Sequence, residues 1–128
     1  MSFLTFSHVL VSDKFIEHVV HGEKSEMLGG HLSGLSRPGK TEFPPSWTRR
    51  HIREAINSIL EQPEVVTFSG KRIFLQKTIR GVQIELKLVI TKKGVVPTSC
   101  FPVWGDGVIR NVGGQQVHID GNNEKEGE

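Results

Sequence analysis

The chain has 128 residues, a size typical of one domain with a sizeable core, and its 36% hydrophobic and 23% charged residues match an ordinary globular protein. No apolar run approaches the roughly 20 residues that a membrane-spanning helix needs, and no signal peptide is predicted at the N-terminus. Cys100 is the single cysteine, which excludes an intramolecular disulfide and a thiolate metal cluster.

The formal net charge of +2 conceals an uneven distribution. Residues 118–128 carry four acids against one lysine, so the preceding residues hold 15 basic and 10 acidic side chains, a net charge of +5. The basic residues gather in two regions: Arg37, Lys40, Arg49, Arg50 and Arg53, then Lys71, Arg72, Lys77, Arg80, Lys87, Lys92 and Lys93. A phosphate-bearing partner would fit this charge, although a solvated basic face is the simpler explanation on charge alone.

Two helices are predicted in the first half of the chain. Ser12 can cap a short helix that Gly22 ends, and its apolar face would be Phe15, Ile16, Val19 and Val20. Residues 23–45 have no periodicity and read as one long loop, a length that is often functional.

The second helix begins after Thr48 as N-cap, with Trp47 packing onto Ile52, and ends before Pro63. Three arginines on its first turns oppose the helix dipole, a small cost that a phosphate or an acidic partner would offset.

After Pro63 the hydrophobic period changes to two. Four strands are predicted, over residues 65–69, 72–79, 82–91 and 95–101, and two short ones over 108–111 and 117–119. Strict alternation from Val82 to Ile90 indicates that one face is buried, and the two helices should cover that face. The predicted fold class is therefore α+β, with N-terminal helices packed on an antiparallel meander. Residues 1–119 would form a single domain, and 120–128 an acidic, flexible tail.

The densest cluster of titratable groups lies in residues 17–32, which hold three histidines, acids, a lysine and the pair Gly29-Gly30. Histidine can both take and give a proton near neutral pH, so this stretch is the first candidate for catalysis. Four pieces of sequence follow one another: Glu17-His18-Val19-Val20-His21-Gly22-Glu23, Leu28-Gly29-Gly30-His31-Leu32, Lys40-Thr41-Glu42-Phe43-Pro44-Pro45-Ser46-Trp47-Thr48, and Gly94 with Thr98-Ser99-Cys100-Phe101-Pro102.

In this order the four pieces resemble the bacterial EndoU endoribonucleases, toxin domains related to the uridylate-specific endoribonuclease of coronaviruses. The resemblance implies an EndoU or barnase-like RNase toxin architecture and a metal-independent RNase that needs no cofactor. Such an enzyme cleaves RNA such as tRNA by moving the 2′-hydroxyl onto the adjacent phosphate, often after uridine, and leaves a 2′,3′-cyclic phosphate. The implied catalytic residues are His18, His31 and Lys40.

The implied substrate-binding residues are Ser99 and Phe101, with Thr98 in place of Ser99 if the strand carries an extra residue, and Ser46. Phe101 stands where the family usually has tyrosine, so it can stack on a base but cannot hydrogen-bond to it. The chemistry independently requires a base, an acid and positive charge. His31 is assigned as the base and His18 as the acid, while Lys40 and the backbone N–H groups of Gly29 and Gly30 would face the phosphate.

The resemblance also implies a setting. Domains of this kind act in the cytoplasm of a target cell, are delivered as the C-terminal part of a secreted protein, and are blocked by a cognate immunity protein. Two alternatives stay open on the sequence alone. His18, His21 and His31 could be zinc ligands, or the chain could be a noncatalytic RNA-binding or protein-interaction module.

Overall fold

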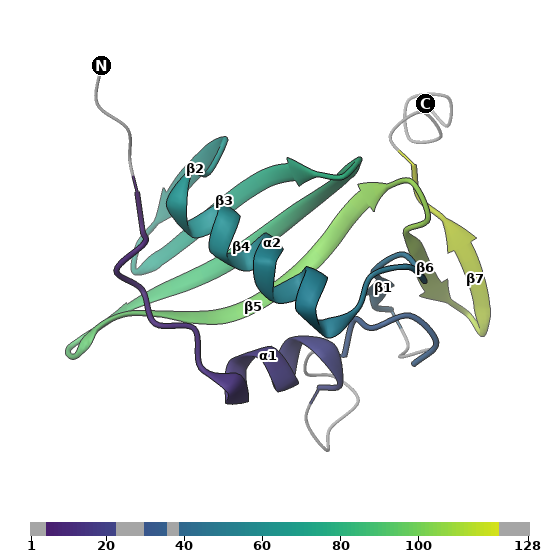
Figure 1. The fold of residues 1–128 in the computed structure, drawn as a ribbon, viewed down its shortest axis with the longest axis horizontal. Coiled ribbons are helices and arrows are strands. Elements are labelled where there is room, and N and C mark those ends of the chain that lie inside the picture. The colour runs from purple at the N-terminus through teal and green to yellow at the C-terminus, as the bar shows by residue number, and fades with distance from the viewer. Residues whose placement is uncertain (1–4, 23–29, 36–38, 121–128) are drawn as a thin grey trace.

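A computed structural model describes residues 5–22, 30–35 and 39–120 (Figure 1). Two helices and two antiparallel sheets confirm the predicted α+β class. The larger sheet has the strand order β2-β3-β4-β5 and the smaller one the order β1-β6-β7. In chain order the elements are α1 (Asp13–Val20), β1 (Thr41–Glu42), α2 (Arg49–Glu61), β2 (Val65–Ser69), β3 (Arg72–Ile79), β4 (Val82–Thr91), β5 (Gly94–Gly105), β6 (Ile109–Val112) and β7 (Gln115–His118).

Both helices begin at the predicted caps. The Ser12 hydroxyl accepts from the N–H of Phe15 at 3.0 Å, and the Thr48 hydroxyl accepts from that of His51 at 3.3 Å. The His51 ring returns the interaction by accepting from the Thr48 N–H, which completes a capping box with histidine in place of the usual glutamate or glutamine. Figure 1 shows α2 lying across the larger sheet and α1 beside β5.

The predicted apolar faces form the core between the helices and the larger sheet. Ile16 and Val19 of α1 and Ile52 and Ile56 of α2 are fully buried, and burial of each side chain this size stabilises the fold by about 1.5–3 kcal/mol. The alternation in β4 holds from Val82 to Leu88. It fails at Ile90, which is 42% exposed because it lies at the end of the strand beside the β4–β5 turn.

Strand β5 is longer than predicted. It continues through Pro102 to Gly105, and its place at the edge of the sheet is one where proline is tolerated. Its pairing with β4 shifts register at two points, between Gln83 and Ile84 and between Lys87 and Leu88. Each shift leaves one residue of β5 unpaired, Val103 and Thr98 respectively.

The smaller sheet corrects the prediction that residues 23–45 are wholly loop. Thr41 and Glu42 form β1, which pairs with β6 in the register Thr41 to Arg110. Two residues are too few to show a period of two, so the sequence carries no strand signal there. The two predicted short strands are present with shifted bounds, joined by a turn in which Gly113 and Gly114 both have positive φ.

Within the described ranges, neither helix is long and apolar enough to cross a membrane. Of the predicted acidic tail, residues 121–128 lie outside the part of the chain that the structure describes.

Candidate functional site

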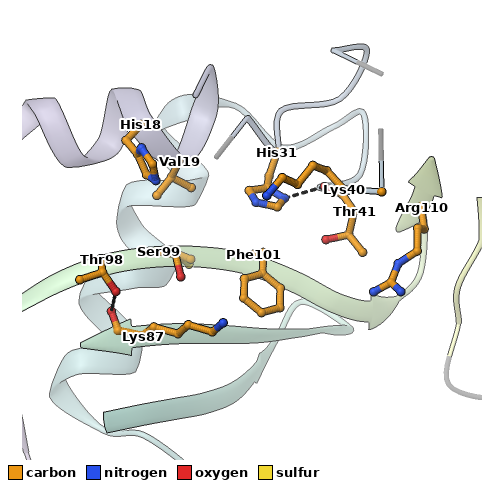
Figure 2. Close-up of a pocket in the computed structure, with 12 residues that line it drawn as sticks. His18, Val19, His31, Lys40, Thr41, Lys87, Thr98, Ser99, Phe101 and Arg110 are labelled. Carbon is orange, nitrogen blue, oxygen red and sulfur yellow. Dashed lines mark hydrogen bonds between the residues drawn. The ribbon is translucent and has the colours of Figure 1, made fainter. Parts of the chain in front are cut away.

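A pocket of about 320 Å³ lies where α1, His31, residues 39–41 and strand β5 meet (Figure 2). It contains both predicted catalytic histidines, the predicted lysine and three predicted substrate-binding residues, together with other side chains that line its walls. The lining residues are His18, Val19, His31, Gly39, Lys40, Thr41, Lys87, Thr98, Ser99, Cys100, Phe101 and Arg110.

The C-terminal end of α1 brings His31 close to His18. The last carbonyls of a helix lack partners within the helix, and here the N–H groups of residues 30–32 supply them. The N–H groups of Gly30, His31 and Leu32 donate to the carbonyls of residues 18, 19 and 20 at 3.2, 2.8 and 3.1 Å. Residues thirteen positions apart in sequence therefore face the same pocket.

This arrangement changes the role predicted for the glycine pair. The N–H of Gly30 donates to the carbonyl of His18, so it is committed to the helix end and we do not assign it to phosphate. Gly30 also has a φ of +84°, a conformation that glycine adopts without strain. We therefore assign Gly30 a structural role, in which its backbone conformation lets the chain pack against the end of α1. Gly29 lies outside the described residues.

His31 is held as a neutral imidazole with its free nitrogen available. Its Nδ1 lies 2.7 Å from the carbonyl oxygen of Thr41, and because a carbonyl only accepts, Nδ1 carries the proton. The other nitrogen, Nε2, therefore has the lone pair that a base needs. Burial lowers the pKa of His31 to about 4, with Lys40 and His18 adding to the effect, so the ring is neutral at pH 7.

His18 reaches the same pocket from the last turn of α1. Its ring is half-buried and stacks at 6.4 Å on that of Phe15. Figure 2 shows His18 and His31 both extending toward strand β5 from the side of α1. The two rings thus differ in burial, since His31 is 6% exposed and His18 is half-buried.

Lys40 lies beside His31, and its main chain is fixed by β6. The carbonyl of Lys40 accepts from the Asn111 main-chain N–H at 3.0 Å and from its side-chain amide at 3.3 Å. Arg110 of β6 and Lys87 of β4 add two more positive charges to the pocket wall. None of these three cations forms an ion pair with a residue that the structure describes.

Strand β5 presents the predicted substrate-binding residues at the bulge. The extra residue is Thr98, so both Thr98 and Ser99 line the pocket and neither has to replace the other. The Thr98 hydroxyl donates to the carbonyl of Lys87 at 3.3 Å. The Phe101 ring lies 5.8 Å from that of His31, between centroids, and the Nζ of Lys87 lies 5.2 Å from the Phe101 centroid.

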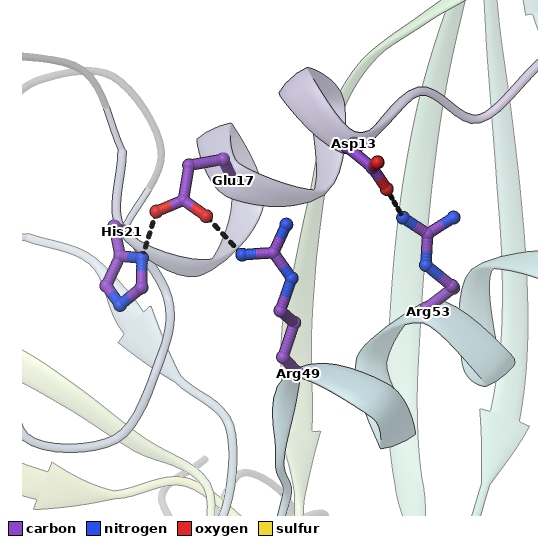
Figure 3. Close-up of polar contacts among 5 residues, drawn as sticks. All are labelled: Asp13, Glu17, His21, Arg49 and Arg53. Atoms are coloured by element: carbon purple, nitrogen blue, oxygen red, sulfur yellow. Dashed lines mark hydrogen bonds and ion pairs between the residues drawn. The ribbon is translucent and has the colours of Figure 1, made fainter.

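Ser46 is not brought to the site. It lies in the exposed turn before α2 and does not line the pocket. His21 also points elsewhere, to an exposed ion pair with Glu17 on the surface of α1 (Figure 3). No group of three or more potential metal ligands converges anywhere in the described ranges.

The arginines of α2 have partners within the chain. Arg49 pairs with Glu17 and Arg53 with Asp13, both from α1, so the acidic partner that would offset the helix dipole is the neighbouring helix (Figure 3). These two arginines are therefore paired within the chain, whereas Lys40, Lys87 and Arg110 of the pocket form no ion pair with a described residue.

Sequence reasoning missed Thr41, Lys87 and Arg110 as pocket residues, and also the buried Glu42 behind them. Glu42 is 1% exposed; its two oxygens accept from the Gly34 N–H and the Asn111 side chain, each at 2.9 Å. Thr41 lies next to Lys40 in the third motif, which was a usable signal. The other two lie on strands where a basic residue is usually only solvated.

Comparisons with models of known protein families, with curated proteins and with solved structures found no match for this chain. The similarity to the EndoU endoribonucleases therefore rests on the four motifs, and the activity that it implies is a proposal.

Proposed function

We propose that the protein is a metal-independent endoribonuclease that cleaves RNA by transesterification and leaves a 2′,3′-cyclic phosphate. One observation carries the proposal: two histidines from distant segments share a pocket rich in cations, and one is fixed as a neutral imidazole with a free Nε2. A pocket of this volume accommodates a nucleotide-sized ligand.

The reaction uses the two histidines in different roles. His31 Nε2 takes the proton of the 2′-hydroxyl as its oxygen attacks the phosphorus, and His18 gives a proton to the departing 5′-oxygen. Each transfer contributes roughly 10²- to 10⁴-fold in rate. Lys40 and Arg110 stabilise the charge that develops on the phosphorane.

Base recognition belongs to β5. Phe101 offers a ring for stacking and the Ser99 hydroxyl can hydrogen-bond to a base edge, which supports a preference for uridine that is weaker than tyrosine would give. The substrate is structured RNA such as tRNA in the cytoplasm of a target cell. An immunity protein that inhibits the toxin would place acidic side chains over the basic pocket.

The test is RNA cleavage in excess chelator, with analysis of the product ends. We expect cyclic phosphate ends from the wild-type protein and a loss of at least about 100-fold in His18→Ala and His31→Ala. His8→Ala, which removes an exposed histidine outside the pocket, is the matched control.

RNA binding without cleavage would overturn the nuclease and leave the noncatalytic RNA-binding module. Cleavage that chelator abolishes would overturn the metal-independent mechanism.

A further inference from the structure

A second hollow, of about 430 Å³, lies on the outer face of the larger sheet, next to the pocket. Its lining residues are Arg72, Phe74, Lys87, Leu88, Val89 and Thr98. Lys87 and Thr98 also line the first pocket, so the two hollows are neighbours at these residues of β4 and β5.

Strand register explains the position of this second hollow. Phe74 of β3 lies directly opposite Lys87 of β4, which lies directly opposite Ser99 of β5. Directly opposed residues lie on the same face of the sheet. Within β4, Lys87 alternates with the buried Leu86 and Leu88, which face the helices. Lys87 and the two residues opposite it therefore face away from the helices. An aromatic ring, a cation and a hydroxyl thus form one line that leads from Phe74 to the pocket.

Lys87 stands between two aromatic rings. Its Nζ lies 5.8 Å from the Phe74 centroid and 5.2 Å from the Phe101 centroid. Two rings with a cation between them match the order of a single-stranded nucleic acid, in which a phosphate links the sugars of two neighbouring nucleotides and each base can stack on a ring. Arg72 adds a second cation at the far end of this hollow and forms no ion pair with any described residue.

Glu85 also lies on the outer face of the sheet, but it does not line the second hollow. Glu85 is one row nearer the smaller sheet, opposite Phe101, and accepts a hydrogen bond from the Gln76 side chain at 2.9 Å. The charge that lines the second hollow is therefore entirely basic.

We propose that this second hollow is a subsite for the nucleotide on the 5′ side of the one that is cleaved, with its base stacked on Phe74 and its linking phosphate on Lys87. The inference rests on the proposed function, because the direction follows from the site. The histidines hold the scissile phosphate on one side of Phe101, so the chain that continues past Phe101 to Phe74 is the upstream one.

Three short substrates that each contain one ribose test the proposed subsite. Because only a ribose has the 2′-hydroxyl that attacks the phosphate, each substrate can be cleaved at one position only. They are the dinucleotide rU-dA, the 5′-extended dU-rU-dA and the 3′-extended rU-dA-dA. We expect the 5′ extension to raise kcat/KM by about 10-fold, the value of one stacked base. The 3′ extension should raise it far less.

Phe74→Leu should bring the ratio of kcat/KM for dU-rU-dA over rU-dA close to one. Phe68→Leu is the matched control: it removes an exposed phenylalanine from the same hairpin, opposite Ile73 and hence on the other face. Arg72→Gln, which leaves every core contact in place, is a second variant that should lower the same ratio. Thermal unfolding of each variant verifies that it is folded.

A gain from 5′ extension that survives Phe74→Leu, or no gain at all, overturns the subsite. A binding measurement distinguishes failure of the subsite from failure of the proposed nuclease. The probe is a 5′-fluorescein-labelled uridine hexamer, and fluorescence anisotropy follows its binding. If no substrate is cleaved but Phe74→Leu weakens hexamer binding about 10-fold relative to Phe68→Leu, the nuclease and the 5′ assignment fail, while the second hollow stands as a nucleotide-binding site. Equal hexamer binding by the two variants overturns the subsite independently of cleavage.

Discussion

His31 links the chemistry of the site to the stability of the fold. Its pKa falls from 6.5 to about 4 on folding because the ring is buried, with only 6% of its surface exposed. Between these two values the unfolded chain binds a proton that the folded chain does not, so unfolding becomes more favourable as the pH falls. The contribution is complete above pH 6.5 and lost below about pH 4.

We therefore expect His31 to account for about 3 kcal/mol of the stability that the wild-type protein loses between pH 7 and pH 4. His31→Gln should lose less over the same range, because glutamine does not titrate. Urea unfolding at several pH values measures the difference, and His118→Gln, an exposed histidine, should behave as the wild type does. Parallel pH curves for wild type and His31→Gln would contradict the depressed pKa.

The same low pKa keeps the His31 ring unprotonated down to about pH 4, so it could still accept a proton at acidic pH. If His31 is the base, the acidic limb of kcat/KM lies near pH 4 and not near 6.5, since activity falls only when the base is protonated.

At the scale of elements, Glu42 joins three segments behind the site. One oxygen holds the Gly34 N–H and the other holds Asn111 of β6, while the neighbouring Thr41 carbonyl orients His31. A buried carboxylate can accept from both donors, whereas an amide presents one donor of its own to one of them. Glu42 is thus suited to its place by its two acceptors.

Glu42→Gln should therefore destabilise the protein by roughly 1–3 kcal/mol, the cost of leaving a buried polar group unsatisfied. Chemical denaturation measures the change. Glu54→Gln is the control, because its pair with Arg50 is exposed and 3.6 Å long, and such pairs contribute little. A loss no greater than that of Glu54→Gln would show that the buried network does not stabilise β1.

The elements that could be predicted are those whose signals are local. Ser12 and Thr48 cap their helices with their own side chains, and β4 shows its buried face by alternation within one strand. Strand β1 could not be predicted, because its stability comes from Asn111, 69 residues away. Likewise, the donation from the Gly30 N–H to the carbonyl of His18 joins residues twelve positions apart, which no local pattern specifies.

Across the whole molecule, ion pairing distinguishes the arginines of α2 from the basic residues of the pocket. Arg49 and Arg53 are paired with acids of α1, whereas Lys87 and Arg110 line the pocket without an acidic partner among the described residues. From the sequence alone these four basic residues cannot be distinguished, because the ion pairs between α1 and α2 form only in the folded chain. The prediction of a phosphate partner therefore applies to the pocket region and not to the first turns of α2.

Salt dependence measures this difference. Each phosphate contact with single-stranded RNA contributes about 0.7 to the slope of log K against log salt concentration. Lys87→Gln and Arg110→Gln should each lower the slope for a uridine hexamer by about that amount. Arg53→Gln, which removes the same charge from a paired position, should leave the slope nearly unchanged, since charges more than about 8 Å from a bound strand are screened at physiological ionic strength. Equal slopes for all three variants would mean that the RNA meets a diffuse basic surface, and that the pocket has no special part in holding it.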